Sequence, residues 1–239
     1  MAQITELSVF FPAYNEEKNI LNTVNAAENV LKKLFKKYEI LIIDDGSSDK
    51  TAEICQAIER KNPKIRLIRH EINRGYGAAL ISGLYSSKYS WIAFTDSDGQ
   101  FDFSELSRLI EKQETTNASL IIGQYINRKV PFIRKLNTLG WQTLVRLFFG
   151  LKVKDIDCGF KLISKNVLTK ISKLESQRGA FISTEFLVKA KLAGFKIVEL
   201  PVHHYPRIQG KPTGADFKVI VESFKDLFKL RAKLKNEKI

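Results

Sequence analysis

The feature that most constrains the fold of this chain is an alternation of strand-like and helix-like segments through its first 125 residues. Short apolar or β-branched runs alternate there with longer segments of helical periodicity. Because strands joined by helices of this length form βαβ crossovers, we predict an α/β fold with a mostly parallel sheet and helices on both faces. The predicted strands cover residues 7–11, 39–44, 65–69, 91–96 and 119–123, and the predicted helices cover about 16–35, 50–60, 77–86 and 103–114.

The rest of the chain continues this pattern less regularly. No linker-like composition, repeat or low-complexity tract separates the two halves. We therefore predict one domain over residues 1–239, in which residues 126–239 form a distinct subregion. The predicted elements there are helices 133–149 and 184–193, strands 157–164 and 196–203, and a basic amphipathic helix 216–235.

Polar residues at two helix starts suggest how those helices are capped. Asn15 is a candidate N-cap, because acidic residues follow it and favour the positive end of a helix dipole. Ser47 or Ser48 is the candidate N-cap of helix 50–60.

Composition excludes several classes of protein. The chain has 239 residues, of which 44% are hydrophobic, so global disorder is excluded. Its two cysteines, Cys55 and Cys158, are too few for a disulfide scaffold or a zinc module, and we expect Cys158 to serve in packing. Neither a run of about 18 apolar residues nor a signal-peptide pattern is present. We expect a soluble, intracellular protein.

Positive charge is concentrated in two segments. The net charge is +13; residues 115–154 hold seven basic and no acidic residues, and residues 200–239 hold nine basic and four acidic ones. Such asymmetry suggests an anionic partner, namely nucleic acid, anionic lipid or a phosphorylated substrate, although a basic surface that serves solubility is the alternative. We predict no nucleic-acid partner, because acidic clusters follow the strands and no RNA-binding aromatic signature occurs.

A pair of carboxylates follows the fourth predicted strand. In Thr95-Asp96-Ser97-Asp98-Gly99-Gln100, both aspartates point roughly the same way, into the crevice at the strand ends. Adjacent carboxylates repel each other unless a cation joins them, and Mg²⁺ or Mn²⁺ would suit these hard oxygen ligands and bridge to substrate phosphates. The alternative is an Asp-rich turn that caps the next helix.

Three further polar clusters lie at strand ends. They are residues 12–16, 44–49 and 73–78. In the second cluster a capped turn at Gly46 is the alternative to a binding site. The third could cradle an anion at a helix N-terminus, but it lacks the last glycine of the dinucleotide-binding fingerprint and follows the third strand.

Taken together and in this order, the four clusters resemble glycosyltransferase family 2, which has the GT-A nucleotide-sugar-binding fold. The resemblance covers Ser8 to about Gly123 and implies that residues 1–125 bind the donor. It implies that Asp45 grips the base and that Gln100 is a third metal ligand beside Asp96 and Asp98. The implied donor-binding residues are Pro12, Tyr14, Glu16, Asp45, Gly75, Asp96, Ser97 and Asp98.

The second half resembles the dolichyl-phosphate glucose and mannose synthase branch of this family. Residues 157–162 (DCGFKL) and 199–202 (ELPV), followed by Arg207 and Gly210, carry this resemblance. It implies a polyprenyl phosphate acceptor whose phosphate binds basic residues of the region 126–239. The sequence departs from the branch at Gln124-Tyr125, where Ser-Arg is usual, and at residues 210–213. The implied acceptor-binding residues are Arg128, Arg134, Lys135, Arg207 and Lys211.

The implied reaction is an inverting transfer of a hexose from a UDP- or GDP-sugar. An acceptor phosphate is already ionised near neutral pH, so it needs no strong base. Asp157 and Glu185 complete the predicted catalytic set of Asp96 and Asp98, and one of them would act as base if the acceptor were a hydroxyl. The alternative function is a family 2 enzyme that acts on a saccharide or protein acceptor in cell-surface glycan synthesis. We expect His203 and His204 to be structural.

A polyprenyl acceptor also implies an anionic membrane surface as a partner. Because a prenyl chain stays in the bilayer, we predict peripheral association with the cytoplasmic membrane face through helices 133–149 and 216–235. Trp141 and Phe149 are the predicted membrane contacts in the first helix. The alternative is that the apolar faces of both helices pack on the protein's own sheet.

Overall fold

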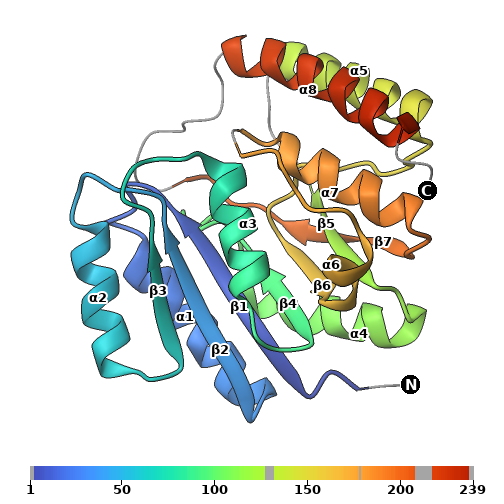
Figure 1. Cartoon of the computed structure of the whole chain (residues 1–239). Helices are drawn as coiled ribbons and strands as arrows, with labels where there is room; N and C mark the ends of the chain where they lie inside the picture. Colours follow the sequence, from blue (N-terminus) through green and yellow to red (C-terminus); the bar gives the residue numbers. More distant parts are fainter. Residues whose placement is uncertain (1–2, 127–131, 178, 208–216, 237–239) are drawn as a thin grey trace.

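The structure is a computed structural model that describes residues 3–126, 132–177, 179–207 and 217–236 (Figure 1). One seven-stranded sheet includes strands from both halves of the chain, in the order β3-β2-β1-β4-β6-β5-β7. The strands are β1 (Glu6–Ala13), β2 (Lys37–Asp44), β3 (Ile65–Arg69), β4 (Trp91–Phe94), β5 (Leu120–Ile126), β6 (Lys161–Ser164) and β7 (Ile197–His203). The helices are α1 (Ile20–Leu34), α2 (Thr51–Lys61), α3 (Tyr76–Ser86), a 3₁₀ turn η1 (Phe103–Glu105), α4 (Leu106–Thr116), α5 (Phe132–Phe149), α6 (Asn166–Lys170), α7 (Phe181–Leu192) and α8 (Phe217–Asn236).

The sheet is mixed rather than parallel throughout. β3, β2, β1 and β4 are parallel neighbours, and β5 is parallel to β7. β6 lies antiparallel between β4 and β5, so the predicted parallel character holds for both ends of the sheet but not for this strand. β6 is also shorter than the predicted strand 157–164, because the residues before Lys161 form turns.

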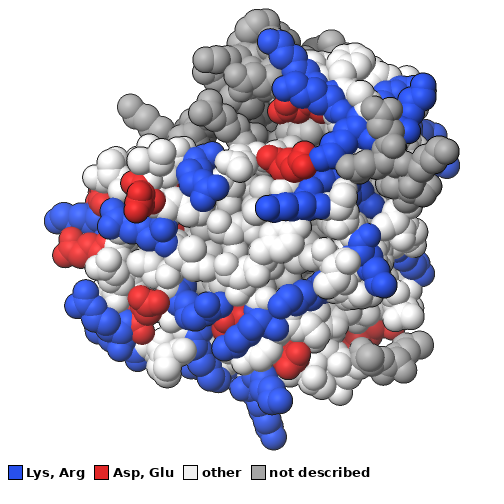
Figure 2. Space-filling model, viewed as in Figure 1, with Lys and Arg blue, Asp and Glu red and all other residues white. Residues whose placement is uncertain are grey.

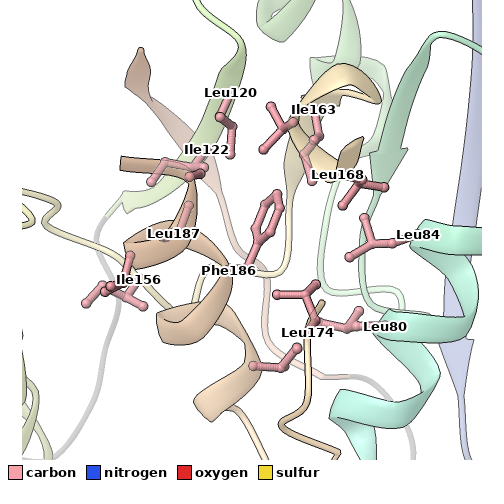
Figure 3. Close-up of a cluster of buried hydrophobic side chains, with 14 of the residues drawn as sticks. Leu80, Leu84, Leu120, Ile122, Ile156, Ile163, Leu168, Leu174, Phe186 and Leu187 are labelled. Atoms are coloured by element: carbon pink, nitrogen blue, oxygen red, sulfur yellow. The ribbon is translucent and has the colours of Figure 1, made fainter. Parts of the chain in front are cut away.

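Helices cover both faces of the sheet, as predicted, and each face has its own apolar core. In β1, Val9 and Phe11 pack on the face covered by α1, α2 and α4, whereas Phe10 packs on the opposite face with α3 and α7. This alternation follows from the two-residue repeat of a strand. In the second core, Phe186 of α7 lies among Leu80 and Leu84 of α3 and apolar residues of β5, β6 and α6 (Figure 3).

The α5–α8 pair, which consists of helices α5 and α8, forms an outer layer. The two helices lie side by side and pack against α7 rather than directly on the sheet (Figure 1). Leu227 and Leu230 of α8 and Val145 of α5 are buried in this contact. Of the helices in the described parts of the chain, none is both long enough and apolar enough to cross a bilayer.

Two predicted helix caps are wrong. α1 begins at Ile20 rather than near Asn15, which adopts a left-handed conformation with φ of 55°. The Asn15 Oδ1 atom instead accepts a hydrogen bond from the Ser48 N–H (2.9 Å). At α2 it is Asp49, not a serine, whose Oδ1 accepts the Thr51 N–H (2.9 Å). Both polar side chains that were predicted as caps therefore join the loops after β1 and β2.

Candidate active site

Four polar loops meet at one edge of the sheet. Since β1 to β4 are parallel neighbours, the loops that follow them leave the sheet on the same side. The Asn15 N–H donates to Ser47 Oγ (2.9 Å), which joins the loops after β1 and β2. The Ser97 hydroxyl donates to the Pro12 carbonyl (2.7 Å), which joins the loops after β4 and β1. The structure thus brings the predicted donor-binding segments together.

Asp45 is a buried carboxylate that organises the loop after β3. Its Oδ1 accepts the Arg74 N–H (3.0 Å) and lies 2.6 Å from His70 Nδ1, while its Oδ2 accepts the Gly75 N–H (2.8 Å). His70 Nε2 lies 2.9 Å from Ser82 Oγ on α3. Sequence analysis missed His70, although its position directly after a strand was a usable signal. These contacts fix Asp45 in one orientation.

Asp96 is held between a phenol and a glycine. The Tyr76 hydroxyl donates to Asp96 Oδ1 (2.9 Å), and a Cβ atom added to Gly159 would lie 2.4 Å from Asp96 Oδ2. Burial and then the nearby Asp98 carboxylate raise the pKa of Asp96 to about 6. Burial, followed by the Asp96 charge, raises the pKa of Tyr76 well above its usual value, so the phenol remains a donor. Neither Tyr76 nor Gly159 was predicted as a site residue.

Arg207, a predicted acceptor-binding residue, lies among the donor-side carboxylates. Its Nη2 donates to Glu16 Oε1, and its Nη1 lies 3.6 Å from Asp98 Oδ2. Asp98 Oδ1 also accepts the Gln100 N–H (3.1 Å), and the Gln100 side-chain amide donates to the Tyr205 carbonyl (2.8 Å). The guanidinium therefore supplies positive charge at the carboxylates that were predicted to bind a cation.

The residues predicted to line the nucleoside pocket differ in exposure. Glu16 is buried, its N–H donates to Thr51 Oγ1 (2.8 Å), and its Oε2 accepts from Asn19 Nδ2 (2.7 Å). Tyr14 is exposed at the mouth of the same loop, with 38% of its surface accessible. Glu16 is thus fixed in place, whereas the Tyr14 side chain is accessible to solvent.

The first residue of β6 is a buried cation, and the segment before β6 contains an exposed carboxylate. Lys161 is fully buried, its Nζ donates to the Cys158 carbonyl, and it lies 5.4 Å from the centre of the Phe94 ring. Burial lowers the pKa of Lys161, an effect that the nearby carboxylates oppose. Asp157 is exposed, as its predicted role near an acceptor requires. The expectation for Cys158 is confirmed, because the thiol is buried and burial raises its pKa to about 12.

The prediction that Glu185 acts near the acceptor is corrected by its position. It lies on α7 with 2% of its surface exposed. Its Oε1 pairs with Lys189 Nζ (2.7 Å) and accepts the Glu175 N–H (3.0 Å), while its Oε2 accepts the Ser176 N–H (2.8 Å). A carboxylate with these partners anchors a loop, since a general base must reach a proton of the acceptor.

Both histidines at the end of β7 make structural contacts, as predicted. His203 Nδ1 lies 2.9 Å from Glu105 Oε1, and the His203 N–H donates to Glu105 Oε2 (2.8 Å). The His204 ring packs edge-on against Tyr125 and Phe101. These contacts hold β7 against the segment that follows the Asp96 loop.

The donor set fits a divalent cation that also binds substrate. In the described residues, no three His, Cys, Asp or Glu side chains are grouped to hold a metal ion by themselves. Asp96 and Asp98 supply carboxylate oxygens, and the Arg207 guanidinium lies 3.6 Å from one of them, Asp98 Oδ2. Mg²⁺ commonly binds to one or two carboxylates and completes its coordination with substrate phosphates and water. The two aspartates are thus candidate ligands of a cation that substrate phosphates would also bind.

Four of the predicted acceptor-binding side chains lie outside the described residues. Arg128 and Lys211 belong to segments that the structure does not describe. The backbone of Arg134 and Lys135 lies in the first turn of α5, but their side chains are not described. These four assignments stay predictions.

Comparisons with known proteins agree with this architecture. Residues 8–172 match the model of glycosyl transferase family 2. A dolichyl-phosphate beta-glucosyltransferase of Trichomonas vaginalis is 34% identical over 208 residues, and that of Saccharomyces cerevisiae is 31% identical over 219 residues. Each match covers 82% of this chain, which spans 64% and 66% of the respective relative's length.

The fold also matches solved structures. Glucosyl-3-phosphoglycerate synthase from Mycobacterium tuberculosis, solved with Mn²⁺, UDP-glucose and phosphoglyceric acid, superposes with a TM-score of 0.71 at 18% identity. That match covers 96% of this chain and 80% of the other. With its sequence matching the family model over most of its length and its sheet matching such a structure, this chain belongs to glycosyltransferase family 2 and has the GT-A fold.

Proposed function

We propose that this chain transfers a hexose, with inversion, from a UDP- or GDP-sugar to a polyprenyl phosphate of the dolichyl or undecaprenyl type. The observation that supports this proposal is the contact of Arg207, a predicted ligand of the acceptor phosphate, with Glu16 and Asp98, two residues predicted to bind the donor. The two relatives named as dolichyl-phosphate glucosyltransferases support the acceptor class. The mycobacterial enzyme, whose structure contains Mn²⁺ and UDP-glucose, supports UDP-glucose as the first donor to test.

The donor is held by residues of the first half. Asp96 and Asp98 would hold Mg²⁺ or Mn²⁺, with Gln100 as a third candidate ligand, and such a cation neutralises charge on the leaving diphosphate. Asp45, fixed by the loop at Gly75, would orient the nucleobase. Pro12, Tyr14, Glu16 and Ser97 complete the proposed donor pocket.

The acceptor would be bound by Arg207 together with Arg128, Arg134, Lys135 and Lys211. A guanidinium suits a phosphate because it presents paired N–H donors in one plane. Bound there, an acceptor phosphate oxygen would attack the anomeric carbon from the face opposite the leaving diphosphate. The protein supplies orientation and screening of two anions rather than a strong base.

A hydroxyl acceptor, as in a saccharide or protein, would need a base. Of the two carboxylates predicted for that role, Glu185 is buried in its own network and Asp157 is exposed. An enzyme for such acceptors would therefore depend on Asp157. This dependence separates the alternative function from the proposed one.

Product partitioning tests the proposal. The purified protein is incubated with labelled sugar nucleotides, a polyprenyl phosphate and Mn²⁺, and the products are extracted with organic solvent. The proposal expects label in the organic phase, and expects Asp157→Asn to retain most of the transfer. Label that stays in the aqueous phase, bound to added saccharide, would support the alternative function instead.

Peripheral membrane association is part of the proposal, with contacts revised by the structure. Trp141 packs edge-on against Phe181 and Phe224, and Phe149 is buried in the core, so neither ring is an outward contact. Among the side chains of the α5–α8 pair that the structure describes, the exposed large apolar ones are instead Leu139, Leu147, Phe224 and Phe228.

Basic residues accompany these apolar side chains. Figure 2 shows Lys and Arg side chains gathered over this end of the molecule, in the upper right of the view. Arg146, Lys225 and Lys229 are exposed there, and the Arg231 guanidinium lies 4.2 Å from the centre of the Phe148 ring. Apolar side chains next to basic ones are typical of helices that lie in the headgroup region of an anionic membrane, here the cytoplasmic face.

A further inference from the structure

We propose that Tyr76 is a positioning residue that holds the Asp96 carboxylate in the orientation required for a divalent cation. This inference rests on the proposed function only in so far as Asp96 and Asp98 bind the cation. The Tyr76 hydroxyl donates to Asp96 Oδ1 at 2.9 Å, which leaves Oδ2 to face the other side. Tyr76 is the first residue of α3, whereas Asp96 follows β4, so the hydrogen bond joins two separate elements.

The second Asp96 oxygen is confined by backbone. A Cβ atom on Gly159 would lie 2.4 Å from Asp96 Oδ2, which means that the turn before β6 closely approaches this oxygen. Rotation of the carboxylate would break the Tyr76 hydrogen bond. A side chain at residue 159 would collide with Oδ2, so glycine at this position leaves the room that this orientation of Asp96 needs.

Tyr76 itself is placed by the loop that precedes α7. The Ala78 N–H donates to the Gln177 carbonyl (2.8 Å), and a Cβ atom on Gly77 would lie 2.2 Å from the Ser176 carbonyl oxygen. The first turn of α3 therefore rests directly on the backbone of this loop. Any shift of the loop would move the Tyr76 hydroxyl relative to Asp96.

Glu185 and Lys189 of α7 fix that loop from the opposite side. Glu185 accepts N–H groups of Glu175 and Ser176, and Lys189 Nζ donates to the Lys173 carbonyl (2.6 Å). A continuous series of contacts thus runs from α7 through the loop and Tyr76 to Asp96. Glu185, which was predicted from the sequence as a catalytic residue, thus supports the cation site through this series of contacts.

Partners of this kind determine how well a carboxylate binds a metal. Hydrogen-bond partners that orient a ligating side chain typically change metal affinity by about 10- to 100-fold when they are removed. Tyr76→Phe removes only the hydroxyl and keeps the ring that packs at the start of α3. We therefore expect loss of this hydroxyl to weaken cation binding about tenfold.

The experiment measures Mn²⁺ binding directly, with the same concentration of UDP for every variant and without acceptor, by the electron paramagnetic resonance signal of free Mn²⁺. Tyr85→Phe is the matched control, because Tyr85 lies on the same helix and 43% of its surface is exposed. The inference expects about tenfold weaker binding by Tyr76→Phe, unchanged binding by Tyr85→Phe, and similar thermal midpoints for all three proteins.

A second variant guards against a general loss of folding in the first. Gly159→Ala adds the Cβ atom that would meet Asp96 Oδ2, so it should weaken Mn²⁺ binding while leaving the Tyr76 hydroxyl in place. If Tyr76→Phe binds Mn²⁺ with the dissociation constant of the wild type, the inference is overturned and the proposed function is left intact. If the wild-type protein binds no Mn²⁺, with or without UDP, both the inference and the cation site of the proposed function are overturned.

Discussion

The donor side of the site and the α5–α8 pair differ in how their functional side chains are held. On the donor side, Asp45 and Asp96 are fixed by hydrogen bonds from neighbouring loops, with distances between 2.6 and 3.0 Å. On the α5–α8 pair, Leu147 and Phe228 are largely exposed to solvent, at 72% and 57%. Under the proposed function, the nucleotide and cation would meet a preorganised surface, whereas binding of the membrane would depend on adaptable contacts.

This difference predicts where single substitutions act most strongly. A preorganised charge loses most of its effect when its geometry or charge is changed, because it costs little reorganisation in the intact protein. An exposed apolar contact is one of several and contributes a smaller share of binding. The four predictions that follow run from the first kind to the second.

Asp98→Asn should have the largest effect, a loss of transfer of about 100-fold or more, because it removes a charged metal ligand and not a core contact. The measurement is the initial rate at saturating donor and acceptor, with the thermal midpoint as a check of folding. EDTA should abolish transfer by the wild-type protein, and addition of Mg²⁺ or Mn²⁺ should restore the transfer. Full wild-type activity in the presence of the chelator would contradict the assignment of a cation site.

Arg207→Gln should separate the two sides of the site. We expect the apparent KM for polyprenyl phosphate to rise about tenfold, corresponding to one lost charge-assisted contact of about 1.4 kcal/mol, with little change for the donor. Mn²⁺ binding in the presence of UDP should become tighter, because a positive charge 3.6 Å from Asp98 Oδ2 is removed. Arg60→Gln, at an exposed position of α2, is the control.

An equal rise of both KM values in Arg207→Gln would place this arginine in the donor pocket instead. Weaker Mn²⁺ binding by the variant would show that the guanidinium supports the carboxylates rather than competing with a cation. Either result would change the role assigned to Arg207 in the site.

His70→Ala should have a smaller effect, confined to the donor. The substitution removes the ring nitrogen 2.6 Å from Asp45, but two backbone N–H groups still hold that carboxylate. We expect a rise in the donor KM of about fivefold, in keeping with the loss of one hydrogen bond worth about 1 kcal/mol. His70→Gln retains a donor and should recover part of the loss. An unchanged donor KM in His70→Ala would show that the backbone donors alone orient Asp45.

Much of the fold could be predicted because its signals are local. The bounds of β3, Ile65–Arg69, equal those predicted, since this strand follows directly from its alternating apolar residues and the adjacent loops. α6 was missed, because five residues are too few to show a helical period. The strand predicted over residues 157–164 is too long, because residues 157–160 form a turn and an irregular segment that brings Gly159 close to Asp96.

The site was predictable where a motif is continuous and not where it depends on distant contacts. Asp96 and Asp98 lie in one short segment, so their pairing is visible in the sequence. The contact of Tyr76 with Asp96 joins residues 20 positions apart and is visible only in the structure. The burial of Glu185 was not predicted, because the sequence alone does not distinguish a buried glutamate from an exposed one. Lys189, one turn later among apolar residues, was the available signal that the pair is buried.

The smallest expected effect concerns the membrane, and it tests the adaptable side of the comparison. Leu147→Ser and Phe228→Ser should each weaken binding to liposomes of anionic lipid by a few fold, because each removes one apolar side chain from the headgroup region. Binding should also fall with salt, since each Lys or Arg near the surface contributes about 1 kcal/mol on anionic lipid.

Leu192→Ser provides the control for the liposome experiment, since Leu192 is an exposed leucine that belongs to α7 and not to the α5–α8 pair. Sedimentation with liposomes at low salt separates bound from free protein. Trp141→Ser should act differently from the two surface variants, because the Trp141 ring packs between Phe181 and Phe224 and its loss should lower the thermal midpoint. If the wild type stays in the supernatant yet still glycosylates lipid, the acceptor reaches the site without docking of the α5–α8 pair. In that case the acceptor, and not the α5–α8 pair, would supply the adaptable contacts.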